Sequence, residues 1–302
     1  MPNASHPAPL ARIGTWNTEF AEPGRVRGER VRPILAAPDC DILCVTEGYA
    51  EILPEGGNIV TGGDDPGYPI VEGQKKVLLW SREPWESVEF GPKEMPEGRF
   101  VAGITRTPIG CLTVVGVCIP WHFAHVDTGC KNRRPWEVHL DWLSSFGRTA
   151  FATASRRTIV LGDFNQRIPR SWTPKLVYAE LRRAFEGLAL STCGELPWQN
   201  GDARGASAPN AGQRLWKASL SEVRRGSNKD QLIDHVAHTQ DLSLVHTATR
   251  HGAERTVGIF PRRTLDGPLS DHFGVWADFT AEPPPTPGVP PAGSSSVSVS
   301  DL

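Results

Sequence analysis

Short apolar runs recur along the chain, and each of them ends in a polar residue. The runs are residues 13–17, 42–47, 111–122 and 159–163, with Asn17, Glu47, His122 and Asp163 at their ends. They are rich in β-branched residues and are bounded by glycine, proline or charge, as is typical of buried β-strands. Residues 76–80 and 231–236 are further strand candidates. Every second residue from 273 to 279 is apolar, which predicts a last strand with one face in the core.

A helical spacing of apolar residues is found in two segments between these strands. Pro135 opens the first segment, whose expected buried face is Trp136, Leu140, Leu143 and Phe146 or Gly147. The second begins with Thr173 as the N-cap and Pro174 in the first turn, and its expected buried stripe is Leu176, Leu181, Ala184, Phe185 and Leu188. Because strands dominate and helices separate them, the sequence predicts an α/β or α+β fold of layered sheets.

The two ends of the chain differ from its body in composition. Residues 281–302 are rich in proline, glycine and serine, and residues 1–10 hold three prolines. Such segments bury too little surface to offset the entropy lost on ordering, so we expect both to be disordered. Residues 11–280 contain no comparable linker and are predicted to form one domain, with a loop-like stretch at 195–228.

Composition narrows the class of protein. The chain has 302 residues, is 39% hydrophobic and 22% charged, and has a formal charge of −2. These values exclude global disorder and a histone-like mode of nucleic-acid binding, although a local basic patch stays possible. No apolar run reaches the ~20 residues that span a bilayer, and the first ten residues do not resemble a secretory signal. Six scattered cysteines without a C-x-x-C pair favour a reducing compartment, so we expect a cytoplasmic protein.

The polar residues at the strand ends carry the candidate chemistry. Asn17, Glu47, His122 and Asp163 follow apolar runs, whereas Asp271 and His272 come directly before one. An antiparallel neighbour would bring that last pair to the same sheet edge. Carboxylate and amide oxygens gathered in this way are the ligands that Mg²⁺ prefers, and Glu47 is the first choice of ligand. The sequence therefore predicts a divalent-metal site that acts on a phosphate-type substrate.

Spacing within the polar motifs suggests which side chains work together. In extended chain, Asp163 and Asn165 point to the same side, so one can orient a water while the other donates to an oxyanion. Adjacent side chains diverge, so Asp271 is a poor partner for His272. Asp234, held in an apolar strand, is the better candidate to orient this histidine.

These motifs together resemble the endonuclease/exonuclease/phosphatase superfamily. The signatures are Trp16 and Asn17, Thr46 and Glu47, the strand ending in His122, Gly162 to Asn165, and Ser270 to His272, with Ile233 and Asp234 between the last two. They occur in family order and span most of the chain. The resemblance implies a four-layer sandwich of two packed mixed β-sheets flanked by helices, with the site at one edge.

The resemblance also implies roles for individual residues. Glu47 would bind the divalent metal, Mg²⁺ or Mn²⁺, with Asn17 and Asp271 in or beside its shell. Asp163 would position the attacking water, Asn165 would hold the phosphate, and His272 paired with Asp234 would act as general acid/base. His122 resembles the second histidine of the deoxyribonuclease and sphingomyelinase branches. The chain departs from the first of these branches at residues 74–76, where a glutamate would orient that histidine.

The substrate class stays open at this level. A nucleic-acid phosphodiester is the leading interpretation because basic residues, Arg133 and Arg134 among them, flank the signatures and are candidate phosphate contacts. A phosphomonoester and a phospholipid or inositol phosphoester are the alternatives within the family. A non-catalytic phosphate-binding or nucleic-acid-binding protein is the alternative of another class, but it would be expected to have lost some of the six signature residues. Two tryptophans of the loop-like stretch, Trp198 and Trp216, are candidates for stacking on a base or sugar.

Overall fold

The computed structural model describes a large part of the chain. The described residues are 9–64, 67, 69–93, 95, 98–154, 157–168, 170, 172–190, 232–245, 247–248, 254–255 and 257–282. Nearly all of the two termini predicted to be disordered lies outside them, as do the whole 195–228 loop and Trp198 and Trp216 within it. Within the described residues, no helix is both long and apolar enough to cross a bilayer.

Seven strands form the first sheet, which contains the N-terminal strand. In spatial order they run β10-β16-β1-β2-β4-β3, and β13 also pairs with β16. Only β1 and β2 pair in parallel. The bounds are β1 (Ala11–Asn17), β2 (Ile42–Gly48), β3 (Asn58–Thr61), β4 (Lys75–Ser81), β10 (Leu242–Leu244), β13 (Gly258–Phe260) and β16 (Gly274–Ala281).

Five strands form the second sheet, in the order β5-β6-β7-β8-β9. Here β7 and β8 are the parallel pair, so this sheet is also mixed. Its strands are β5 (Trp85–Glu89), β6 (Phe100–Thr107), β7 (Gly110–Cys118), β8 (Thr158–Asp163) and β9 (Asp234–His238). Two short ladders lie apart from both sheets: β11 (Thr247–Ala248) with β12 (Glu254–Arg255), and β14 (Arg263–Thr264) with β15 (Gly267–Pro268).

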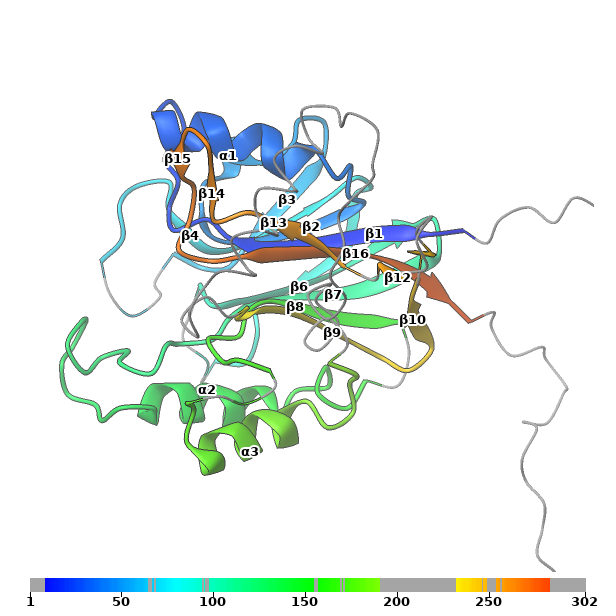
Figure 1. The fold of residues 1–302 in the computed structure, drawn as a ribbon. Coiled ribbons are helices and arrows are strands. Elements are labelled where there is room, and N and C mark those ends of the chain that lie inside the picture. Colours follow the sequence, from blue (N-terminus) through cyan, green and yellow to red (C-terminus); the bar gives the residue numbers. More distant parts are fainter. Residues whose placement is uncertain are drawn as a thin grey trace, which may run out of the picture.

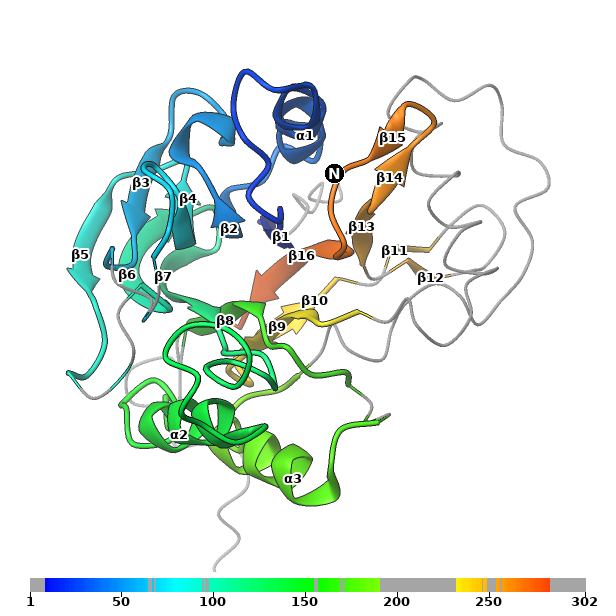
Figure 2. The same cartoon turned by 90° about the vertical axis from the view of Figure 1, so that its left-hand side faces the viewer.

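Helices cover the outer faces of the two sheets. Helix α1 (Val26–Ala36) lies on the first sheet, whereas α2 (Glu137–Phe146) and α3 (Lys175–Ala184) lie on the second (Figures 1 and 2). A short 3-10 helix, η1 (Ala50–Ile52), follows β2. The layers are therefore helix, sheet, sheet and helices, which confirms the predicted fold of two packed mixed sheets flanked by helices.

Apolar side chains fill all three spaces between the layers. In β2, Ile42 and Cys44 pack into the core between the sheets, whereas Leu43 and Val45 pack on the opposite side together with residues of α1. A third core joins the second sheet to α2 and α3, where Phe146 stacks on Phe185 with ring centroids 4.7 Å apart. Because both faces of the central strands are buried, these strands read as continuous apolar runs.

The first helical segment differs from its prediction at its start. Helix α2 begins at Glu137, and Trp136 before it has a left-handed backbone, with φ of 72°. Trp136 and Leu140 are only half-buried, so both are corrected as core positions. The apolar buried face is formed by Val138, Trp142, Leu143 and Phe146, of which the last two were predicted. Trp136 lies before the first helical turn, so the helical spacing does not place it on this face.

The second helical segment begins later than predicted. Pro174 is the N-cap of α3, and Thr173 makes no capping hydrogen bond. The buried stripe is Val177, Leu181 and Ala184, one position after the expected start, and the prediction for Leu176 is wrong because its side chain is 82% exposed. A one-residue shift turns a side chain by about 100° around a helix, which is enough to move it from core to solvent.

Candidate active site

Strands of both sheets bring polar residues to one edge of the sandwich. Parallel pairing of β1 with β2 sets Asn17 beside Thr46, next to Glu47. In the second sheet, antiparallel pairing of β8 with β9 sets Asp163 opposite Asp234. The backbone N–H of Asn17 donates to Asp234 Oδ2 over 2.8 Å and so joins the two sheets at this edge.

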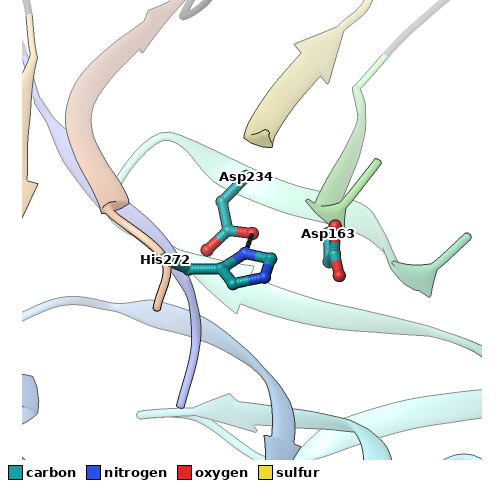
Figure 3. A group of neighbouring side chains, drawn as sticks. All are labelled: Asp163, Asp234 and His272. Atoms are coloured by element: carbon teal, nitrogen blue, oxygen red, sulfur yellow. Dashed lines mark hydrogen bonds and ion pairs between the residues drawn. The ribbon is translucent and has the colours of Figure 1, made fainter. Parts of the chain in front are cut away.

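His272 is held against Asp234 at this edge. Its Nδ1 lies 3.0 Å from Asp234 Oδ1, and its backbone N–H donates to the Ser270 hydroxyl, which itself donates to the carbonyl of Asn17. Asp271 is farther away, at 3.7 Å from Nε2 of the imidazole. Ligand atoms of Asp163, Asp234 and His272 lie within 4.8 Å of one another, and the three side chains converge (Figure 3).

Asp163 is buried and accepts hydrogen bonds on both carboxylate oxygens. Oδ1 accepts the backbone N–H of Asn165 over 2.8 Å, and Oδ2 accepts the amide groups of Asn165 and Asn17 over 2.8 and 3.1 Å. The Asn165 amide also donates to Ile119 O over 2.9 Å, so both of its N–H groups are used. As a phosphate ligand, Asn165 would have to release one of these bonds.

The local backbone explains why Asp163 and Asn165 meet. The strand ends at Asp163, and Asn165 has a left-handed backbone with φ of 50°, so the two do not lie in extended chain as predicted. Phe164 between them is fully buried in the core against α3. Gly162 has φ of 143°, and a Cβ there would lie 1.9 Å from Val117 O of the neighbouring strand, so only glycine fits before Asp163.

The charges of this group shift one another's proton affinity. Burial raises the pKa of Asp163 to about 7, and the negative charges of Asp234 and Glu47 add to this rise while His272 opposes it. Burial alone would lower the pKa of His272, but the carboxylates of Asp234 and Asp163 raise it to about 10. At neutral pH the imidazole is therefore protonated. We call Glu47, Asp163, Asp234 and His272 the carboxylate cluster.

Glu47 has an unusual backbone and a cationic neighbour. It has a left-handed backbone with φ of 48°, and its carbonyl accepts the Thr18 hydroxyl over 2.8 Å. Its carboxylate forms an ion pair with the buried Lys76 Nζ. Burial alone would raise the pKa of Glu47, but the ammonium of Lys76, together with the positive charges of His272 and Arg99, lowers it. Left-handed non-glycine residues are uncommon and concentrate at functional sites, which makes Glu47 a candidate on backbone grounds as well.

The oxygen donors at this edge fit a hard divalent cation. The carboxylates of Glu47 and Asp271 are partly open to solvent, and Asn17 Oδ1 accepts one backbone N–H over 2.8 Å, which leaves a lone pair. Burial is the main cause of the raised pKa of Asp163, and the repulsion from Asp234 and Glu47 that adds to it is a repulsion that a divalent cation relieves. The predicted ligands Asn17, Glu47 and Asp271 therefore suit Mg²⁺ or Mn²⁺ in their chemistry.

The predicted catalytic residue His122 lies in different surroundings. Strand β7 ends at Cys118, four residues before it, so His122 belongs to the following loop. Its imidazole lies 4.2–5.3 Å, between centroids, from four aromatic rings, and burial lowers its pKa. Among the described residues, it makes none of the hydrogen bonds that connect the carboxylate cluster. We call Trp121, His122, Phe123, Trp136 and Trp172 the aromatic cluster.

A buried histidine connects the two clusters. His139 Nδ1 lies 2.6 Å from Pro120 O, and its Nε2 lies 2.7 Å from the amide nitrogen of Gln166, the residue after Asn165. Its ring also meets Trp136 edge-on at 5.2 Å. Burial lowers the pKa of His139 to about 4, so it is neutral, donates through Nδ1 and accepts the Gln166 amide through Nε2.

The two predicted phosphate contacts differ in their surroundings. Arg133 forms ion pairs with Glu137 at 2.6 Å and Asp141 at 3.7 Å. Arg134 is exposed, and its backbone N–H donates to Glu137 over 2.9 Å. Both precede α2, in the segment that follows His122.

Some residues at the site escaped the sequence analysis as functional candidates. Lys76 begins the predicted strand at residues 76–80, but nothing in the sequence tells it apart from Lys75 as a functional residue. Trp172 lies just before α3, and its 52% exposed ring reaches His122 from far along the chain. Trp121 and Phe123, which flank His122 in a polar loop, were the one available signal.

Comparison with known proteins gives a family match over most of the chain. Residues 14–272 match the family model described as "Endonuclease/Exonuclease/phosphatase family". No curated protein sequence gives a significant match.

Solved structures with a similar fold come from several sources. They include the endonuclease domain of TRAS1, a telomere-specific non-LTR retrotransposon (14% identity, TM-score 0.51, covering 91% of this chain and 100% of that one). They also include D. rerio TDP2 (15% identity, TM-score 0.53, covering 90% of this chain and 99% of that one). A further one is the human Nocturnin catalytic domain (14% identity, TM-score 0.54, covering 91% of this chain and 95% of that one). At these identities the likeness shows the fold.

Proposed function

Because the chain belongs to the endonuclease/exonuclease/phosphatase family, we propose that it is a divalent-metal-dependent phosphoester hydrolase that prefers a nucleic-acid phosphodiester. The observation that carries this proposal is the convergence of Asp163, Asp234 and His272 within 4.8 Å, beside the oxygen donors suited to the metal. Members of this family share the reaction class, and the choice of substrate is the part of the proposal that rests on this chain's own residues.

Each predicted catalytic residue has a proposed role. Asp163, with a pKa raised to about 7, orients the attacking water and accepts its proton. His272, kept protonated by Asp234, faces the leaving oxygen with Nε2 and donates a proton to it. Asn165 holds Asp163 in position and is the proposed phosphate ligand. His122, in the aromatic cluster, is proposed to assist as a second histidine.

Glu47, Asn17 and Asp271 are the proposed ligands of Mg²⁺ or Mn²⁺. When bound, the cation supplies stabilisation of the negative charge that develops on the phosphoryl oxygens. The residues themselves supply the geometry, since Asn17 is fixed by its bonds to both Asp163 and Asp234.

The aromatic cluster supports a nucleic-acid substrate. Trp121, Phe123 and Trp172 are 36–52% exposed, and Arg133 and Arg134 lie in the same loop region. Aromatic rings beside basic side chains form stacking platforms for unpaired bases. The D. rerio TDP2 structure is described as a complex with a single strand DNA product, and a single strand is the form whose bases are free to stack.

A phospholipid phosphodiester is the second candidate. It is favoured by the same exposed rings, because tryptophan and phenylalanine also insert at membrane interfaces. The basic residues beside the rings do not separate the two, since anionic lipids attract them as well.

Hydrolysis of a substrate panel tests the proposal. Plasmid DNA, single-stranded DNA, RNA, phosphatidylcholine vesicles, bis-p-nitrophenyl phosphate and p-nitrophenyl phosphate would be incubated with Mg²⁺ or Mn²⁺, with and without EDTA. We expect metal-dependent cleavage of a nucleic-acid diester, lowered about 10³-fold in kcat by Asp163→Ala and by His272→Ala. Asp266→Ala, an exposed carboxylate between β14 and β15, is the matched control and should retain wild-type activity.

The outcomes separate the alternatives. Cleavage that survives both cluster substitutions would show that the reaction happens elsewhere. Turnover of vesicles alone would select the phospholipid candidate. Binding of single-stranded DNA without turnover of any substrate would favour the non-catalytic alternative.

A further inference from the structure

Lys76 carries a buried positive charge at the site of the proposed metal ligand. It lies in β4, its side chain is 5% exposed, and its Nζ forms an ion pair with Glu47 Oε1. The ammonium also lies 5.0 Å from the ring centroid of Phe20. Lys75, one position earlier, points the other way, is more exposed and pairs with Asp64.

Burial of a lysine is costly, so its position needs a physical reason. Lysine is among the residues least often buried, and a buried ammonium is tolerated when a carboxylate compensates its charge. Glu47 supplies that compensation, and it is the same carboxylate that the proposed function assigns to the metal. An ammonium and a divalent cation both seek carboxylate oxygens, so the carboxylate of Glu47 attracts both.

We propose that Lys76 is a resident cation of the metal site, which competes with the divalent metal for the carboxylate of Glu47. This inference rests on the proposed function, in which Glu47 is the metal ligand. The metal binds by displacing the ammonium from Glu47, so Lys76 lowers the affinity for the metal and keeps the site charge-compensated while the metal is absent. Lys76 thereby sets the metal concentration at which the enzyme becomes active.

Direct metal binding tests this competition without any use of activity. The full-length protein would be stripped with EDTA and dialysed, and Mn²⁺ would be titrated by calorimetry and by the electron paramagnetic resonance signal of free Mn²⁺. We expect Lys76→Met to bind Mn²⁺ at least about tenfold more tightly than wild type. Lys76→Arg, which keeps a cation at Glu47, should stay close to wild type.

Lys75→Met is the matched control for loss of charge alone. It removes the same charge one residue away without touching Glu47, so its Mn²⁺ affinity should change by less than about twofold, because exposed charges are screened. Equal gains from Lys75→Met and Lys76→Met would mean that overall charge, and not the ion pair, decides the affinity. Unchanged or weaker Mn²⁺ binding by Lys76→Met would likewise overturn the proposal.

A stability measurement keeps the test informative if Lys76→Met folds poorly. Loss of the ammonium removes the ion-pair partner of Glu47, so Tm in EDTA should fall and the rise in Tm on adding Mn²⁺ should be larger than in wild type. Lys76→Gln is a second variant for which we expect the same pattern. If Mn²⁺ raised the Tm of these variants by no more than it raises the Tm of wild type, the proposal would be contradicted.

Glu47→Gln distinguishes this inference from the function on which it rests. It should weaken Mn²⁺ binding in the wild-type and Lys76→Met backgrounds alike. If it does not, Glu47 is not the metal ligand and the proposed competition with Lys76 is wrong. Metal-dependent hydrolysis of the substrate panel would still support the proposed function in that case. If the panel shows no metal-dependent turnover, the proposed function fails, whatever the Mn²⁺ affinities are.

Discussion

The carboxylate cluster and the aromatic cluster are neighbours that are built in opposite ways. The first lies at strand ends of both sheets, and its charges are buried and paired, as His272 is with Asp234 at 3.0 Å. The second lies on loops after β7 and before α2 and α3, and its rings contact one another in tilted and edge-on arrangements. Rigid strands suit groups that must be held within fractions of an ångström, whereas loops suit recognition of a substrate.

The two histidines of these clusters express the same contrast. Carboxylates raise the pKa of His272 to about 10, whereas burial among rings lowers the pKa of His122. At neutral pH, His272 is therefore a cation and His122 is neutral, although both are histidines of the same domain. Surroundings, and not residue type, decide which of them can donate a proton.

Removal of the Trp172 ring should have the largest effect and should distinguish the role of the aromatic cluster from that of the carboxylate cluster. Trp172→Ala should raise KM for a single-stranded oligonucleotide about tenfold or more, because stacking of a base on an aromatic ring contributes roughly 1–3 kcal/mol. The kcat for bis-p-nitrophenyl phosphate should change much less, since this small ester has no unpaired base to stack on Trp172. Steady-state kinetics on both substrates measures the split.

Phe90→Ala provides the control for this experiment, because Phe90 is also an exposed aromatic residue but lies after β5, outside the aromatic cluster. The separation of roles would be wrong if Trp172→Ala lowered turnover of the small ester as strongly as that of the oligonucleotide.

Lowering the pH should reduce the stability that neutral His139 contributes between the two clusters. The folded pKa of His139, about 4, lies below its ordinary value, so its contribution to the free energy of unfolding is complete above about pH 6.5 and is lost as the pH falls toward 4. Between pH 7 and 5 this amounts to about 2 kcal/mol. His139→Asn keeps a donor for Pro120 O but does not titrate, so it should lose about 2 kcal/mol less than wild type over this range.

Urea denaturation of metal-free protein at the two pH values measures this difference. Taking the difference between the proteins removes the contribution of Asp163 and Asp234, whose raised pKa values act in the opposite direction. Parallel losses in the two proteins would mean that His139 is not neutral in the folded state.

The sequence predicted the carboxylate cluster well and the aromatic cluster poorly, for a physical reason. Strands buried on both faces read as apolar runs, and their ends are marked by the first polar residue, such as Asn17 or Asp163. The ion pair of the Lys76 side chain with Glu47 and the contact of the Trp172 ring with His122 depend on packing between distant segments, which no local pattern encodes. The extended backbone assumed at Asn165 was wrong for a local reason: its backbone N–H and its side-chain amide donate to Asp163 two residues earlier, in a turn whose left-handed backbone asparagine tolerates.

The smallest expected effect concerns the two arginines beside the aromatic cluster. Arg134→Ala should reduce the slope of log KM against log salt concentration for single-stranded DNA by about one, the value for one phosphate contact. Arg133→Ala should change it less, because Glu137 and Asp141 already compensate the charge of Arg133 and a phosphate would have to displace them. Kinetics from low to moderate salt, with both variants side by side, measures this. Equal slopes would show that the ion pairs of Arg133 give way to the substrate, so that the loop before α2 rearranges on binding while the strand ends of the carboxylate cluster stay in place.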